Sequence, residues 1–279
     1  MKSLILALLA GIAFQFVVSV DAFAQPQVNP TDESTRVAAV RIVSQIQRAD
    51  YEGNQAGMQK GYEELKLFVE HRDIASLVRY WRGFAQWRRA MNGFNDSVNP
   101  TEIEQDLKQA LDEFSKAAEL DPGFVEAKIG IVSSYGNLAF LNRKDQAQAQ
   151  ELIAKSVRTL KEARAAAPDN PRLLWVLGPI LWNVPAEREG GQSKAIENYE
   201  RGLQLARNGK SSTSADSLDP SWGKPELLMN LAWSFLNKET PDLEAAERYA
   251  RSALELVPYW HYVRDILLPQ ILAAKAKAK

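Results

Sequence analysis

Residues 156–181 read SVRTLKEARAAAPDNPRLLWVLGPIL, which contains the end of one amphipathic helix and the start of another. Ser156, Leu160 and Ala163 share one helix face, since they are spaced by four and three residues. Pro168 stops that helix, and the Asn-Pro pair that follows is typical of a helix start, because proline suits the first helical turn. Small residues on the shared face allow a partner helix to approach closely. The stretch therefore predicts two helices that pack together as a pair.

The same spacing recurs along the chain. Three further second helices carry it at Ala110-x3-Phe114-x2-Ala117, Ala195-x3-Tyr199-x2-Gly202 and Ala246-x3-Ala250-x2-Ala253. The first and third of these end in proline, at Pro122 and Pro258. The helices before them carry a matching pattern, clearest at Leu174-x2-Leu177-Gly178-x2-Leu181 and Leu228-x2-Leu231-Ala232-x2-Phe235.

These paired motifs resemble the tetratricopeptide repeat (TPR), whose signature is W-x2-L-G-x2-Y, then A-x3-F and a final proline, on a period of about 34 residues. The resemblance covers roughly residues 73–258, and residues 36–70 look like a degenerate earlier pair. The repeats here are spaced more widely than in the family. The resemblance implies an all-α fold, an irregular α-solenoid of about five antiparallel helix pairs with a C-terminal capping helix.

Hydrophobic periodicity supports an all-helical chain. From residue 35 almost to the end, apolar residues recur at three- and four-residue spacing, and no convincing run alternates with period two. The predicted helices span residues 35–50, 54–70, 73–91, 102–120, 123–141, 144–167, 171–183, 191–207, 223–237, 242–257 and 260–275.

The N-terminus has the features of a cleavable signal peptide over residues 1–24. Lys2 precedes an apolar run, and Ala22-Phe23-Ala24 is a small-x-small cleavage pattern. An uncleaved anchor is the alternative, but the apolar run is shorter than the roughly 20 residues that a span needs. We expect a linker at 25–34, a helical-repeat domain at 35–275 and a basic tail at 276–279. The mature protein is expected to be periplasmic or secreted, and not an integral membrane protein.

Composition excludes several functions. Thirty-four basic and 35 acidic residues give a net charge of −1, which argues against a nucleic-acid partner. Without cysteine, the chain has no thiolate metal site or cysteine nucleophile, and its two histidines, His71 and His261, lie far apart. Ser221 and Lys224 match S-x-x-K, but the companion motifs of those acyl-transfer enzymes are missing. We expect no catalytic residue, no metal and no cofactor, with a Ser221–Lys224 hydrolase as a weak rival.

Aromatic and amide side chains are the candidates for partner binding. Trp175 and Trp182 lie two turns apart on one face of a predicted first helix, where they either pack in the core or line a groove. In TPR arrays the first helix of each pair lines the concave groove, which also points to Trp233. Trp87 lies beside Arg88, an arrangement that can receive an acidic or aromatic group.

Three asparagines follow the last signature residue of successive first helices, namely Asn137, Asn183 and Asn237. Facing inward, they would form an amide ladder for a peptide backbone, as groove asparagines do in peptide-binding members of the TPR family. The alternative is helix C-capping, because asparagine tolerates the left-handed conformation.

The sequence thus favours a non-enzymatic exported scaffold that presents a concave helical groove to a protein or peptide. The alternative is a periplasmic small-ligand-binding or transporter-accessory protein, an analogy at the level of the fold. Under either hypothesis, the long connections at residues 183–191 and 209–225 are expected to carry specificity.

Overall fold

The structure, a computed structural model, describes residues 30–208 and 218–278, with side chains from Ser34 onward. All regular elements in these ranges are helices, and the all-α prediction is confirmed. They are α1 (Pro30–Glu52), α2 (Gln55–Glu64), α3 (Ala75–Asn95), α4 (Pro100–Leu120), α5 (Val125–Leu141), α6 (Gln146–Ala166), α7 (Pro171–Asn183), α8 (Gln192–Asn208), α9 (Lys224–Asn237), α10 (Leu243–Leu256) and α11 (Leu268–Ala278). Short 3-10 turns form η1 (Leu65–Phe68) and η2 (Ala186–Arg188), and a π-helical segment, η3 (Tyr262–Leu267), leads into α11.

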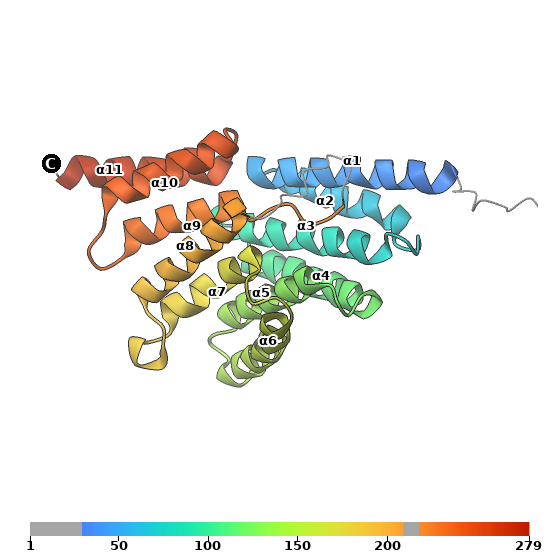
Figure 1. Ribbon diagram of the computed structural model, residues 1–279, viewed down its shortest axis with the longest axis horizontal. Helices are drawn as coiled ribbons and strands as arrows, with labels where there is room; N and C mark the ends of the chain where they lie inside the picture. Colours follow the sequence, from blue (N-terminus) through green and yellow to red (C-terminus); the bar gives the residue numbers. More distant parts are fainter. Residues whose placement is uncertain (1–29, 209–217, 279) are drawn as a thin grey trace, which may run out of the picture.

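Consecutive helices pack as antiparallel pairs, from α1–α2 to α9–α10, and the pairs stack side by side (Figure 1). The second helix of one pair packs on the first helix of the next at α2/α3, α4/α5 and α8/α9. The junction between α6 and α7 is different, since α6 packs along α5 but makes at most marginal contact with α7. The helical-repeat architecture with α11 as a terminal cap therefore agrees with the prediction.

Small residues produce the close packing that the repeat pattern predicted. Phe114 fills the space between α3 and α5, where a Cβ on Gly83 or Gly130 would lie 2.8 or 2.5 Å from its ring. Helix starts also follow local chemistry. The side chain of Asn170 accepts hydrogen bonds from the first backbone N–H groups of α7, and Pro171 occupies the first turn.

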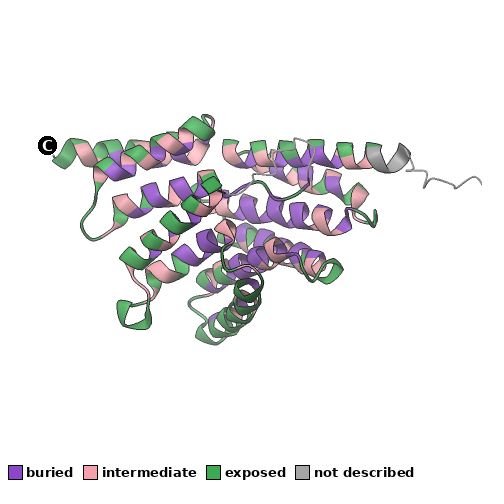
Figure 2. Cartoon of the chain, in the orientation of Figure 1, coloured by how far each residue is buried: buried purple, intermediate pink, exposed green. Residues whose placement is uncertain are grey.

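The core is centred on α3, where every residue from Trp81 to Arg88 is buried (Figure 2). The rings of Trp87, Trp175 and Trp222 meet at its centre, with centroids 5.4–5.7 Å apart. Trp222 comes from the α8–α9 connection, and its Nε1 donates to the Tyr80 hydroxyl at 2.6 Å. This corrects the expectation for residues 209–225, because the described part from Leu218 onward is core rather than a specificity loop.

The domain boundaries need two corrections. α1 begins at Pro30, inside the expected linker at 25–34, because proline is tolerated in a first helical turn. α11 continues to Ala278, so most of the expected tail is helical.

The predicted signal peptide lies outside the described residues. None of the helices in the two described ranges reaches the combination of length and hydropathy that a membrane span requires.

The row of pairs curves until its first and last units touch, at what we call the closing contact (Arg48, Tyr51, Asp96, Tyr259, Trp260 and His261). The ring centroids of Tyr51 and Trp260 lie 5.0 Å apart, edge to face. Arg48 lies over the Tyr259 ring at 4.8 Å, and His261 Nε2 lies 3.5 Å from a carboxylate oxygen of Asp96. The array therefore closes into a ring of helix pairs, a feature that the predicted α-solenoid did not include.

Arginines on α3 tie this helix to α4, and the burial of one of their partners, Asp106, makes the stability depend on pH. Asp106 is buried and lies 2.7 Å from Arg89. Its burial raises the pKa to about 6, despite the opposing charge of Arg89. The folded state then holds the Asp106 proton more tightly than the unfolded state, so this group's contribution to stability falls as the pH rises from about 4 to 6.

We expect Asp106→Asn to remove that contribution, because the amide keeps a hydrogen-bond acceptor but does not titrate. From pH 4 to pH 7, the free energy of unfolding of the wild type should fall relative to the variant by about 2 to 3 kcal/mol. Urea unfolding at both pH values measures the difference. A constant difference between the two proteins would contradict the raised pKa, and Asp112→Asn, at an exposed ion pair, is the matched control.

Candidate ligand-binding pocket

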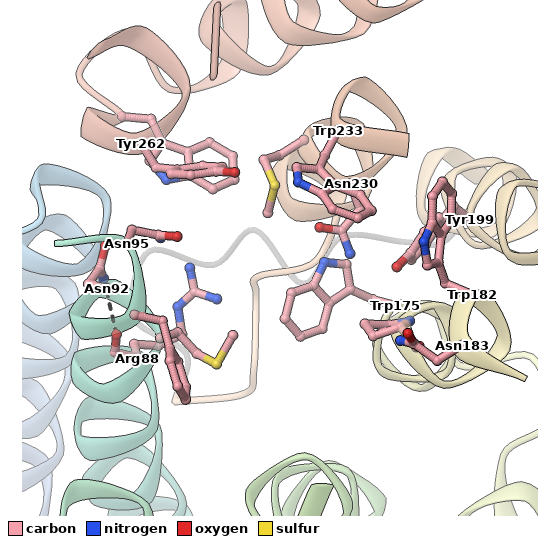
Figure 3. A pocket seen from close by; sticks show the side chains of 15 residues that line it. Arg88, Asn92, Asn95, Trp175, Trp182, Asn183, Tyr199, Asn230, Trp233 and Tyr262 are labelled. Carbon is pink, nitrogen blue, oxygen red and sulfur yellow. Dashed lines mark hydrogen bonds between the residues drawn. The ribbon is translucent and has the colours of Figure 1, made fainter. Parts of the chain in front are cut away.

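A pocket of about 290 Å³ lies inside the ring, between α3, α7, α9 and the residues that begin the C-terminal helix (Figure 3). Its aromatic lining consists of Phe94, Trp175, Trp182, Tyr199, Trp233, Trp260 and Tyr262. Its polar lining consists of the amides Asn92, Asn95, Asn183 and Asn230 and, as the one charged group among the described lining residues, Arg88. Met91, Met229 and Pro179 complete the wall.

Five of the residues that the sequence singled out meet in this pocket. They are Arg88, Trp175, Trp182, Asn183 and Trp233. The rings of Trp182 and Trp233 lie 5.1 Å apart at 62° and form one aromatic side of it. Trp175 was expected either in the core or in a groove, and it has both roles, because one part of its ring packs on Trp87 while another part lines the pocket.

Trp87 does not reach the pocket. Its side chain is 1% exposed, and its Nε1 donates to the Ser133 hydroxyl at 3.1 Å. The prediction that Trp87 and Arg88 act together is wrong in this respect, because adjacent residues on a helix point in different directions and Trp87 points into the core.

The three asparagines make local contacts instead of a ladder. Asn137, Asn183 and Asn237 each donate from Nδ2 to the carbonyl four residues earlier in the same helix, at 2.8 Å. Asn183 also lines the pocket, whereas the other two lie outside it. None of them has a positive φ, so the left-handed C-cap is not formed either. These amides serve the last turns of their own helices.

Arg88 presents its guanidinium to the pocket from a buried position. Its Nε donates to Asp50 Oδ2 at 2.8 Å, and Asn92 donates to the other oxygen of the same carboxylate at 2.9 Å. Burial opposes the charge, but Asp50 and Glu226 together hold the pKa of Arg88 above its usual value. Figure 3 shows the terminal nitrogens of the guanidinium directed into the cavity, while its Nε is the atom bound to Asp50.

A second hydrogen-bond donor at the pocket is the indole N–H of Trp175, and this donor lacks an acceptor. The indole Nε1 of Trp175 is buried and has no partner among the described residues. Figure 3 shows this nitrogen turned toward the cavity and Asn230. A buried donor without a partner costs about 1–3 kcal/mol. Two donors therefore face an otherwise aromatic space, an arrangement that is complementary to a ligand with hydrogen-bond acceptors.

The sequence could have indicated some of the other lining residues. Asn92 and Asn95 follow Arg88 by one and two helical turns, so they share its face of α3. Trp260 and Tyr262 carry no such signal, because they reach the pocket only through the ring closure. Burial raises the pKa of the Tyr199 hydroxyl.

Catalytic and metal alternatives find no support in the described residues. No group of three or more histidine and carboxylate side chains there could hold a metal ion. Ser221 Oγ accepts a hydrogen bond from Gln47 at 2.9 Å. No described contact joins Ser221 to Lys224.

Fold and pocket together define an all-α helical-repeat protein with an aromatic pocket inside a ring of helix pairs. No protein-family model matches the chain, and no curated protein matches it. Among solved structures, the chain is similar to the HusA haemophore from Porphyromonas gingivalis, with 20% sequence identity and a TM-score of 0.55. The match covers 78% of this chain and 98% of that one. The likeness concerns the fold, and membership of the TPR family stays a prediction.

Proposed function

We propose that the protein binds a flat, largely apolar small molecule that carries an acidic group, and that haem is the first candidate. One observation carries the proposal, namely that the unpartnered indole Nε1 of Trp175 and the guanidinium of Arg88 both face an otherwise aromatic pocket. The volume of about 290 Å³ lies just below the range for small-molecule pockets, about 300–1,000 Å³.

Haem is favoured for two reasons. A protein with the same fold is named a haemophore. The lining also suits the chemistry of haem, since its flat macrocycle can lie against Trp182 and Trp233 while a propionate accepts from Arg88. Methionine and tyrosine are among the side chains that hold haem iron in proteins, and Met91, Met229 and two tyrosines line the pocket. The proposed role is binding without catalysis, in the periplasm or outside the cell.

A peptide groove on this face has less support. The pocket is small for an extended peptide, and the asparagines that would have held its backbone bond to their own helices. The small-ligand hypothesis therefore replaces the peptide scaffold as the first choice for the inner face of the ring.

We expect Trp175→Phe to weaken haem binding about five- to tenfold, since it keeps an aromatic ring but removes the unpartnered donor, a change of about 1 to 1.4 kcal/mol. Haem is titrated into the full chain, and the Soret absorbance and tryptophan quenching are followed. Tyr249→Phe removes a hydroxyl on α10 outside the pocket and should leave the affinity unchanged. Absence of saturable haem binding would contradict the ligand assignment, and equal affinity of Trp175→Phe and wild type would contradict the role of the donor.

A further inference from the structure

A groove of about 940 Å³ opens between α6, α7 and α8, on a different face of α7 from the pocket. It lies at the junction where α6 does not pack on the following pair. At the α2/α3, α4/α5 and α8/α9 junctions the equivalent space is closed by helix packing. The row therefore lacks one layer of helix packing at this point.

The surface of the groove is apolar over more than two turns. Leu181 of α7 and Leu160 of α6 line it at the surface, and the buried Leu174 and Leu177 of α7 form its floor. Ile153 and Val157 lie two turns and one turn before Leu160 on the same face of α6, and they are 52% and 45% exposed. Ile180 adds a further side chain that is 38% exposed. Exposed apolar residues that are contiguous, rather than scattered, mark interaction sites.

The rim of the groove carries a positive charge. Its basic residues are Arg164, Arg188, Lys194 and Arg201, against Glu189 and Glu197. Arg201 pairs with Asp169, and Lys194 pairs with Glu197. Arg164 and Arg188 form no ion pair with a residue that the structure describes. Basic groups thus remain available at both ends of the groove, because Arg164 lies near the start of α7 and Arg188 lies beyond its end.

We propose that this groove receives one amphipathic helix of a partner protein, with apolar anchors on the buried face and acidic residues at its flanks. Such a helix would supply the packing layer that the α6/α7 junction lacks, and its carboxylates would meet Arg164 and Arg188. The face of α6 from Ile153 to Arg164 extends about 16 Å at 1.5 Å per residue, which matches three turns of the incoming helix. This inference does not depend on the ligand that the pocket binds.

The test uses a fluorescein-labelled synthetic helix of about four turns, with leucines at helical spacing on one face and glutamates elsewhere. Its binding to the full chain is followed by fluorescence anisotropy, beside the same peptide with lysine in place of glutamate. We expect the acidic peptide to bind at least tenfold more tightly than the basic one. No saturable binding of the acidic peptide, or equal binding of both, overturns the proposal.

Variants locate the site. Val157→Asp should weaken binding of the acidic peptide at least tenfold, and Arg164→Glu or Arg188→Glu three- to tenfold. Leu120→Asp, at an exposed leucine on α4 outside the groove, is the matched control and should change nothing. All four substitutions are at exposed positions, and circular dichroism verifies folding. Unchanged binding by Val157→Asp overturns the assignment. A second copy of the chain is the other possible occupant of the groove, and sedimentation of the free chain tests it. A dimer that Val157→Asp dissociates would show that a second copy fills the groove instead.

Discussion

Asp50→Ala is expected to lower the free energy of unfolding by about 3–5 kcal/mol, because it leaves a buried charge without its partner. Asp50 of α1 is 1% exposed and accepts from Arg88 and Asn92 of α3, at 2.8 and 2.9 Å. Without the carboxylate, the guanidinium keeps its desolvation cost but loses the attraction that offsets it. The same loss would release α1 from α3 at the edge of the pocket.

Urea unfolding followed by circular dichroism measures this effect. The double variant Asp50→Ala with Arg88→Leu should be less destabilised than Asp50→Ala alone, because no unpaired charge is then buried. Asp112→Ala is the matched control, since its ion pair with Lys116 is exposed, and it should cost less than about 1 kcal/mol. Equal costs for the two aspartates would contradict the buried-charge explanation.

Gly178→Ala is the second large effect, and we expect it to cost about 3 kcal/mol through overpacking. A Cβ at this position would lie 1.9 Å from Cζ of Tyr199. The Tyr199 ring is buried between α7 and α8 and also forms a wall of the pocket, so it has little freedom to move away. The variant should therefore separate these two helices and weaken ligand binding together with stability.

Gly136→Ala tests the explanation, because a Cβ at Gly136 would meet no atom within 4 Å. On the exposed face of α5, this change should stabilise the protein by about 0.5–1 kcal/mol. A smaller residue at position 199, as in Gly178→Ala with Tyr199→Val, should recover part of the loss. If the two glycine variants unfold alike, the close contact between Gly178 and Tyr199 is not the cause.

Local features were predictable because they depend on residues near each other in the chain. The bounds of α7, at residues 171–183, follow from Asn170 and Pro171 at its start. Gly178 and Tyr199 belong to adjacent helices of one pair, and their spacing in the repeat pattern places the small residue against the large one. The helices and their pairing could therefore be predicted from periodicity, caps and prolines.

The pocket could be predicted only in part, because it combines distant segments. Trp182 and Trp233 belong to first helices of consecutive pairs, so the repeat pattern placed them together. Trp260 is different, because its position opposite α3 depends on the summed angles between all the pairs, and the irregular spacing of this array sets those angles. Trp222 looked like part of a loop, yet its ring fills the centre of the core, since no nearby residue indicated that the connection returns inward.

The closing contact also limits how such a chain can change in length. An open solenoid can gain or lose a repeat at little cost, because each unit touches only its neighbours. Here, duplication of one helix pair would move Trp260 away from Tyr51 and take one wall of the cavity with it. Gain of a repeat should therefore cost this architecture more than it costs an open solenoid.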